Sequence, residues 1–186
     1  GKLYVLPRDI APEGLIYYNK KLFKEAGIPF PDGSWTWDFQ ERPELKEKDF
    51  LWVMHQLTKF KPGSTKPYQY GYLPAWPGMM PDTFMYSYGL EPANDSQKPT
   101  KLQYDTPEMR KVYDFCVDLW QNKKWAPSNV EVTSNLQQGA ETIFVKQEVA
   151  MFQNGIWEVP NIRRDMKPGS PDFFDWDITM FPAYKN

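Results

Sequence analysis

Two tryptophans that follow strand-like runs are the clearest chemical signal in the sequence. Trp76 comes shortly after the run at residues 68–73, and Trp157 shortly after the run at residues 149–153. In open α/β sheets, ligands bind at the carboxyl ends of the strands. An indole held there can stack on the apolar face of a pyranose ring, while nearby Asn, Asp and Glu side chains hydrogen-bond the hydroxyls. The alternative is that each indole packs its own loop.

Residues suited to metal or nucleophilic chemistry are sparse. The chain has one histidine, His55, and one cysteine, Cys116, so it has no His/Cys cluster for zinc and no internal disulfide. Neither a Gly-x-Ser-x-Gly elbow nor a glycine-rich phosphate-binding pattern occurs. Cys116 falls on the apolar face of an expected helix, which indicates an inert buried thiol. We therefore expect no catalytic residues, no metal and no cofactor.

Two groups of carboxylates suggest further chemistry. Asp172, Asp175 and Asp177 are close in sequence, but they lack the glycine and the downstream glutamate of a calcium loop, so we expect a solvated loop. Glu13 and Glu158 are a candidate pair of glycosidase carboxylates, which would have to lie roughly 5–10 Å apart. The sequence does not fix that distance, so a glycoside hydrolase stays open as an alternative.

Length and charge exclude several classes of partner. The chain has 186 residues and a net charge of −2, with both signs interspersed. This length fits one domain, and the lack of a basic stripe argues against a nucleic-acid partner. No run of about 18 apolar residues is present, so nothing in the sequence is expected to span a membrane. Aromatic residues make up 17% of the chain, many in loops, which suits both core packing and a concave binding surface.

The elements that must position the tryptophans alternate between strand and helix, which predicts an α/β fold. We expect strands at residues 2–6, 14–18, 68–73, 149–153 and 175–181. We expect helices at residues 20–26, 44–57, 82–88, 107–121 and 136–146, with another helix or turn beginning at residues 156–161.

Capping residues mark where several helices begin and end. Asn19 can cap the helix at residues 20–26, which Gly27 then terminates. Thr106 can cap the helix at residues 107–121. Thr36 is expected to cap a further helix, with Asp38 in its first turn, until Pro43 interrupts it.

An apolar stripe along the helix at residues 107–121 predicts its buried face. The stripe follows i, i+3, i+4, i+7 spacing and comprises Met109, Val112, Tyr113, Cys116, Leu119 and Trp120. We expect Val112, Cys116 and Leu119 to be buried, and Lys111 and Asp118 to be exposed.

Several segments, in this order, resemble the extracellular solute-binding proteins of sugar ABC importers, the maltose-binding class. They cover nearly the whole chain and lie at residues 1–7, 15–23, 26–28 with 36–38, 144–152, 155–157 and 175–182. One departure is clear. The family runs an unbroken helix after the Thr-Trp-Asp signature at 36–38, whereas residues 40–48, with Pro43, indicate an insertion or break.

The resemblance implies one lobe of a two-lobed periplasmic-binding-protein fold, with a mixed sheet flanked by helices. Residues 1–13 would be a remnant of the first lobe and the hinge approach, residues 14–181 the second lobe, and residues 182–186 the start of the return. The chain is thus expected to be an internal fragment. The segments at 15–18 and 177–180 should be adjacent antiparallel strands at the hinge. Residues 1–7 should be poorly ordered or paired with another copy of the chain.

The resemblance also implies which residues face a ligand. They are Asp9 and Glu13 near the crossing, and Trp76, Asn154, Gly155 and Trp157 in the second lobe, with Tyr86 as a further candidate. Asp9 and Glu13 can alternatively belong to the hinge, and Trp157 can alternatively fill the core beneath Pro160. Gly155 is expected to leave room where backbone and ligand approach.

The implied function is non-catalytic binding of a sugar or oligosaccharide, which is delivered to the permease subunits of an ABC importer. Two lobes would close on the ligand as a population shift. The implied location is the periplasmic or extracellular face of a bacterial membrane, with membrane contact only through a possible lipid anchor. A glycoside hydrolase fragment and a carbohydrate-binding module stay as alternatives, although such modules are mostly β-sandwiches, which the helix at residues 107–121 argues against.

Overall fold

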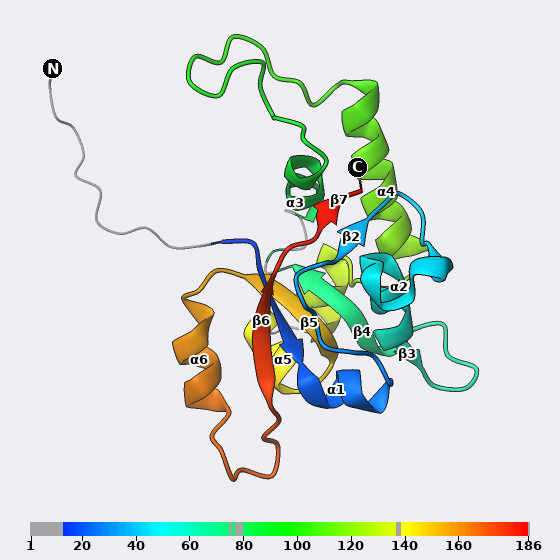
Figure 1. Ribbon diagram of the computed structural model, residues 1–186, viewed down its shortest axis with the longest axis vertical. Helices are drawn as coiled ribbons and strands as arrows, with labels where there is room; N and C mark the ends of the chain where they lie inside the picture. Colours follow the sequence, from blue (N-terminus) through cyan, green and yellow to red (C-terminus); the bar gives the residue numbers. More distant parts are fainter. Residues whose placement is uncertain (1–12, 75, 77–79, 137–138, 186) are drawn as a thin grey trace, which may run out of the picture.

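The computed structural model describes residues 13–74, 76, 80–136 and 139–185. Across these residues, five strands form one mixed sheet (Figure 1). Strands β4 and β5 are parallel, and the other neighbouring pairs are antiparallel. The strand order is β3 (Lys59–Phe60), β4 (Pro67–Pro74), β5 (Val149–Asn154), β1 (Leu15–Asn19) and β6 (Trp176–Met180).

The two expected crossing strands are neighbours in this sheet. Strand β1 pairs antiparallel with β6, so that Leu15 lies opposite Met180 and Tyr18 lies opposite Asp177. Just beyond the pair, the Phe181 N–H donates to the Gly14 carbonyl at 3.1 Å. The predicted adjacency of these segments is confirmed.

Helices cover both faces of the sheet. On one face lie α1 (Lys20–Glu25), α2 (Phe50–Leu57), α3 (Met80–Ser87) and α4 (Pro107–Gln121). On the other lie α5 (Ala140–Val145) and α6 (Glu158–Asp165). Strand β1 shows the division, because Ile16 and Tyr18 join one buried cluster while Leu15 and Tyr17 join the other. The predicted class, a mixed sheet flanked by helices, is confirmed.

The expected caps of α1 and α4 are present. The Asn19 carboxamide oxygen accepts from the Lys21 and Leu22 N–H groups at 2.9 and 3.1 Å, and Gly27 ends the helix with φ +67°. The Thr106 hydroxyl accepts from the Met109 N–H.

The helix predicted at Thr36 does not form. Thr36–Trp37 is instead a short strand, β2, which pairs in parallel with β7 (Ala183–Tyr184). Here the buried Trp37 ring and its distant strand partner outweigh the capping preference of Thr36.

The break at residues 40–48 takes the form of a 3-10 segment, Pro43–Lys48, and α2 begins only after it. The α2 cap is Asp49, whose carboxylate accepts from the Trp52 N–H at 2.9 Å. The helix expected from residue 136 likewise begins later, at Ala140, and a π-helical turn, Glu131–Leu136, precedes it.

Helix α4 buries nearly the face that its stripe predicts. Val112, Cys116 and Leu119 are fully buried, and Lys111 is exposed. Tyr113 was wrongly assigned to this face: it is exposed, and Phe115 packs into the core in its place. Asp118 is only half-exposed. No helix in the described residues is both long and apolar enough to cross a membrane.

Candidate functional site

A pocket of about 610 Å³ opens at one edge of the sheet. Its walls come from the carboxyl ends of β4, β5 and β6, the approach to β1, and one face of α3. This is the edge at which ligands bind in α/β sheets. Six of the seven expected site residues line it: Glu13, Trp76, Tyr86, Asn154, Gly155 and Trp157. The seventh, Asp9, lies outside the described residues.

Three aromatic rings lie on the pocket wall and stay accessible to water. Trp76 is 59% exposed, Tyr86 is 55% exposed and Trp157 is 37% exposed. A tryptophan that filled the core would lack this open surface, so the exposure of Trp157 favours the platform interpretation over packing beneath Pro160. That any of the three rings contacts a ligand stays a prediction.

The Asn154-Gly155 turn sets the position of Trp157. A Cβ atom built on Gly155 would overlap the Trp157 ring. The missing side chain therefore makes room for the indole itself, whereas the sequence suggested that it makes room for a ligand. The turn is anchored from β1 as well, because the buried Tyr17 hydroxyl donates to the Gly155 carbonyl at 2.8 Å.

Asn154 and Glu158 hold the turn through a short network. The Asn154 oxygen accepts from the Gly155 N–H, and its Nδ2 donates to Glu158 Oε1, both at 2.9 Å. Glu158 Oε2 accepts from Asn161 Nδ2 at 3.0 Å. Both oxygens of the buried Glu158 are therefore engaged within the protein, and the Asn154 side chain mainly orders the turn. Burial and the nearby charge of Glu158 also raise the pKa of Tyr17 to about 12.

The polar side of the pocket was missed by sequence reasoning. It consists of Asp82, Thr83 and Ser87 on α3 and Gln153 at the end of β5. The rule that ligands bind at the carboxyl ends of strands pointed to Trp157, and it applies to Gln153 as well. The α3 residues offered no comparable signal, because a polar helical face usually faces solvent.

The segment that follows β6 is fastened to the α3 wall. The Ser87 hydroxyl accepts from Trp37 Nε1 and donates to the Pro182 carbonyl, both at 2.8 Å. Phe181, Pro182 and Ala183 line the pocket. This part of the wall is therefore held to α3 by the Ser87 hydroxyl, whose position is in turn fixed by the Trp37 indole on β2.

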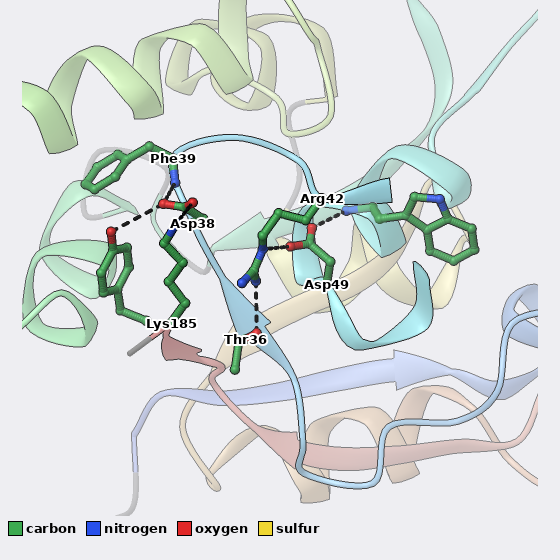
Figure 2. Close-up of polar contacts among 8 residues, drawn as sticks. Thr36, Asp38, Phe39, Arg42, Asp49 and Lys185 are labelled. Carbon is green, nitrogen blue, oxygen red and sulfur yellow. Dashed lines mark hydrogen bonds and ion pairs between the residues drawn. The ribbon is translucent and has the colours of Figure 1, made fainter. Parts of the chain in front are cut away.

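Asp38 fixes the end of the same segment (Figure 2). Its carboxylate pairs with Lys185 and accepts from the Phe39 N–H at 2.8 Å and the Tyr184 hydroxyl at 3.3 Å. Burial alone would raise the pKa of Asp38, but these contacts outweigh it and hold the pKa below its ordinary value. In the same view, Arg42 joins the buried Asp49 carboxylate to the Thr36 hydroxyl.

One of the acidic residues near β6 is engaged in an ion pair. Asp177 pairs with Lys20 at 2.8 Å. Within the part of the chain that the structure describes, no three His, Cys, Asp or Glu side chains lie together as metal ligands would.

A family model described as bacterial extracellular solute-binding protein matches residues 1–186. The chain belongs to this family. No curated protein sequence matches this solute-binding chain.

Solved structures share the fold of this solute-binding chain. UspC of M. tuberculosis is 21% identical, with a TM-score of 0.70 over 94% of this chain and 42% of its own length. An ABC substrate-binding protein from Listeria monocytogenes, in complex with cycloalternan, is 23% identical, with a TM-score of 0.68 over 92% and 37%. MalE of Bdellovibrio bacteriovorus, bound to maltotriose, is 16% identical, with a TM-score of 0.59 over 93% and 39%. The chain thus spans about two fifths of the length of these relatives.

Proposed function

We propose that this chain binds a sugar or an oligosaccharide without catalysing a reaction on it. The observation that carries the proposal is the composition of the pocket. Trp76, Tyr86 and Trp157 expose aromatic rings, whereas Thr83 and Gln153 offer hydrogen-bonding groups. A pyranose has an apolar face that suits the rings and a rim of hydroxyls that suits the polar groups.

The related structures support a carbohydrate ligand. The Listeria protein holds cycloalternan and the Bdellovibrio protein holds maltotriose. Both ligands are built of sugar rings, which need the combination of flat apolar contacts and hydrogen bonds described above. The proposed role is delivery of the sugar to the permease subunits of an ABC importer, outside the cytoplasmic membrane.

We assign residues 14–181 to one lobe of a two-lobed site. Residues 1–13 and 182–186 would then lead from and to the other lobe. The hydrogen bond between Gly14 and Phe181 supports this assignment, because both connections leave the sheet side by side next to the pocket. A ligand held by one lobe alone is expected to bind weakly.

The alternatives explain the geometry less well. The glycosidase that the sequence left open would use Glu13 and Glu158 as its pair of carboxylates, but both oxygens of Glu158 accept hydrogen bonds from Asn154 and Asn161. A carbohydrate-binding module of the common kind would be a β-sandwich, whereas here helices cover both faces of a mixed sheet.

The proposal is tested by titrating the isotopically labelled chain with sugars and following its indole N–H signals by NMR. The probes are glucose, galactose, mannose and xylose, with their short oligosaccharides, at millimolar concentration. The Trp76 and Trp157 signals should move, and the signal of Trp125, a buried ring stacked on His55, should not. If no sugar moves Trp76 or Trp157, or if every indole moves alike, binding in this pocket is rejected. Release of free sugar from an oligosaccharide would instead support the hydrolase.

A further inference from the structure

A chain of side-chain hydrogen bonds runs from the core to the pocket wall. The hydroxyl of Tyr72 on β4 donates to Oε1 of Gln153 on β5. Gln153 Nε2 in turn donates to the hydroxyl oxygen of Thr83 on α3 at 3.2 Å. Gln153 and Thr83 line the pocket, whereas Tyr72 is fully buried behind them.

Burial of Tyr72 sets the direction of these two hydrogen bonds. Burial holds the pKa of the Tyr72 phenol well above its ordinary value, so the hydroxyl keeps its proton. A buried O–H needs an acceptor, and among the described residues that acceptor is Gln153 Oε1. A flipped Gln153 amide would leave the phenol proton without an acceptor. The amide nitrogen therefore points toward Thr83.

The two hydroxyls on this face of α3 differ in whether their proton already has an acceptor within the protein. Thr83 and Ser87 lie one helical turn apart, and each hydroxyl has a single proton to donate. Ser87 donates its proton to the Pro182 carbonyl. Thr83 accepts from Gln153, but its own proton has no acceptor in the described part of the chain. The second N–H of Gln153 is likewise without a protein acceptor there.

We propose that Thr83 and Gln153 form a donor pair that binds an oxygen atom of the ligand, and that Tyr72 is a positioning residue that fixes the pair. This inference rests on the proposed sugar-binding function and specifies the chemistry of its polar side. The carboxylate of Asp82, the preceding residue on α3, also lines the pocket and has no ion-pair or hydrogen-bond partner among the described residues.

The charge of Asp82 limits which ligand groups can bind at the donor pair. An anionic group at the donor pair would be repelled by this carboxylate. A hydroxyl is uncharged and can accept from Thr83 and Gln153, so it suits the donor pair without being repelled by the carboxylate on the same wall. The donor pair therefore selects a sugar hydroxyl over a carboxylate or a phosphate.

The test compares Thr83→Val, which has the same shape but lacks the hydroxyl, with Thr83→Ser, which keeps it. The probes are the methyl glycosides of glucose, galactose and mannose, with the monodeoxy derivatives of each, titrated by NMR. Thr83→Val should weaken binding of the preferred glycoside about three- to tenfold, the range expected for one neutral hydrogen bond. Thr83→Ser should bind nearly as well as the natural chain.

The deoxy derivatives identify the ligand oxygen involved. One derivative should bind the natural chain about three- to tenfold more weakly than its parent glycoside, yet bind Thr83→Val no worse than the parent does. Tyr72→Phe frees the Gln153 amide, so it should reduce the preference for the parent over that derivative while a melting curve shows the chain still folded. A purely structural role for Tyr72 would leave this preference unchanged.

The possible failures are distinguishable. If glycosides bind but Thr83→Val leaves every affinity unchanged, the donor pair is wrong and the sugar-binding function stands. If the derivatives lose affinity equally in Thr83→Val and the natural chain, the missing hydroxyl contacts another residue and the inference is also overturned. If no sugar of the panel in the previous section and no glycoside binds the natural chain, both the function and the donor pair are rejected.

Discussion

Gly155→Ala should destabilise the fold through one specific collision. The added methyl group would occupy space that the Trp157 ring fills. The backbone φ of Gly155 is not in the left-handed region, so alanine is tolerated at this position apart from the contact with Trp157. Overpacking of this kind costs about 1–3 kcal/mol. For a chain of this size that corresponds to a fall in melting temperature of roughly 2–12 °C.

The assay is a double-mutant cycle with Trp157→Ala, read by thermal melting. Without the indole the collision disappears, and Gly155→Ala should then be neutral or stabilise the chain by about 0.4–1 kcal/mol, because alanine restricts the unfolded state. The effect of one substitution should therefore change sign with the second residue. Equal destabilisation in both backgrounds, or no effect in the natural chain, would refute the role given to Gly155.

Further expectations concern α4, Cys116 and Asp38. Leu119→Ala should cost about 2–5 kcal/mol in chemical denaturation because the side chain is fully buried, whereas Val117→Ala on the exposed face should change stability by less than about 0.5 kcal/mol. Burial raises the pKa of the Cys116 thiol, so a thiol reagent should modify it only as fast as the chain unfolds, and rapid modification of the folded chain would contradict its placement. The pKa of Asp38 is lowered in the folded state, so its contribution is present above the ordinary Asp range and lost as pH falls through the folded value. The stability difference between the natural chain and Asp38→Asn should accordingly be full at neutral pH, begin to fall near about pH 4, and vanish only below the lowered pKa of folded Asp38; a difference that does not fall in acid would argue against the pairing with Lys185.

Strands β1, β4, β5 and β6 were predictable because their signals are local or come from the family. The apolar runs at residues 149–153 and 175–181 give the pairing partners of β1, and the resemblance gives their arrangement. The segment at Thr36 shows the limit of this reasoning. A threonine before a tryptophan suits both a helix cap and a strand, and the partner that decides for the strand, Ala183, lies far along the chain.

The aromatic wall of the pocket was likewise easier to predict than its polar wall. Trp76 and Trp157 are large, follow strands and carry chemistry by residue type alone. The roles of Asn154, Thr83 and Gln153 depend on which partner each side chain meets, and those partners come from other elements. Asn154 was expected to face a ligand, yet the structure uses most of its carboxamide to hold the turn before Trp157. Sequence gives the donors and acceptors but not their pairing.

The hydrogen bond from the Phe181 N–H to the Gly14 carbonyl has a practical consequence for protein engineering. Residues 14–181 begin and end at neighbouring points of one sheet edge, so they can be grafted into a surface loop of a host protein without pulling its loop ends apart. The pocket opens beside this junction. A ligand that shifts the β1 and β6 ends would therefore strain the host at the graft point, and a fluorescent host would report that strain as a change in signal.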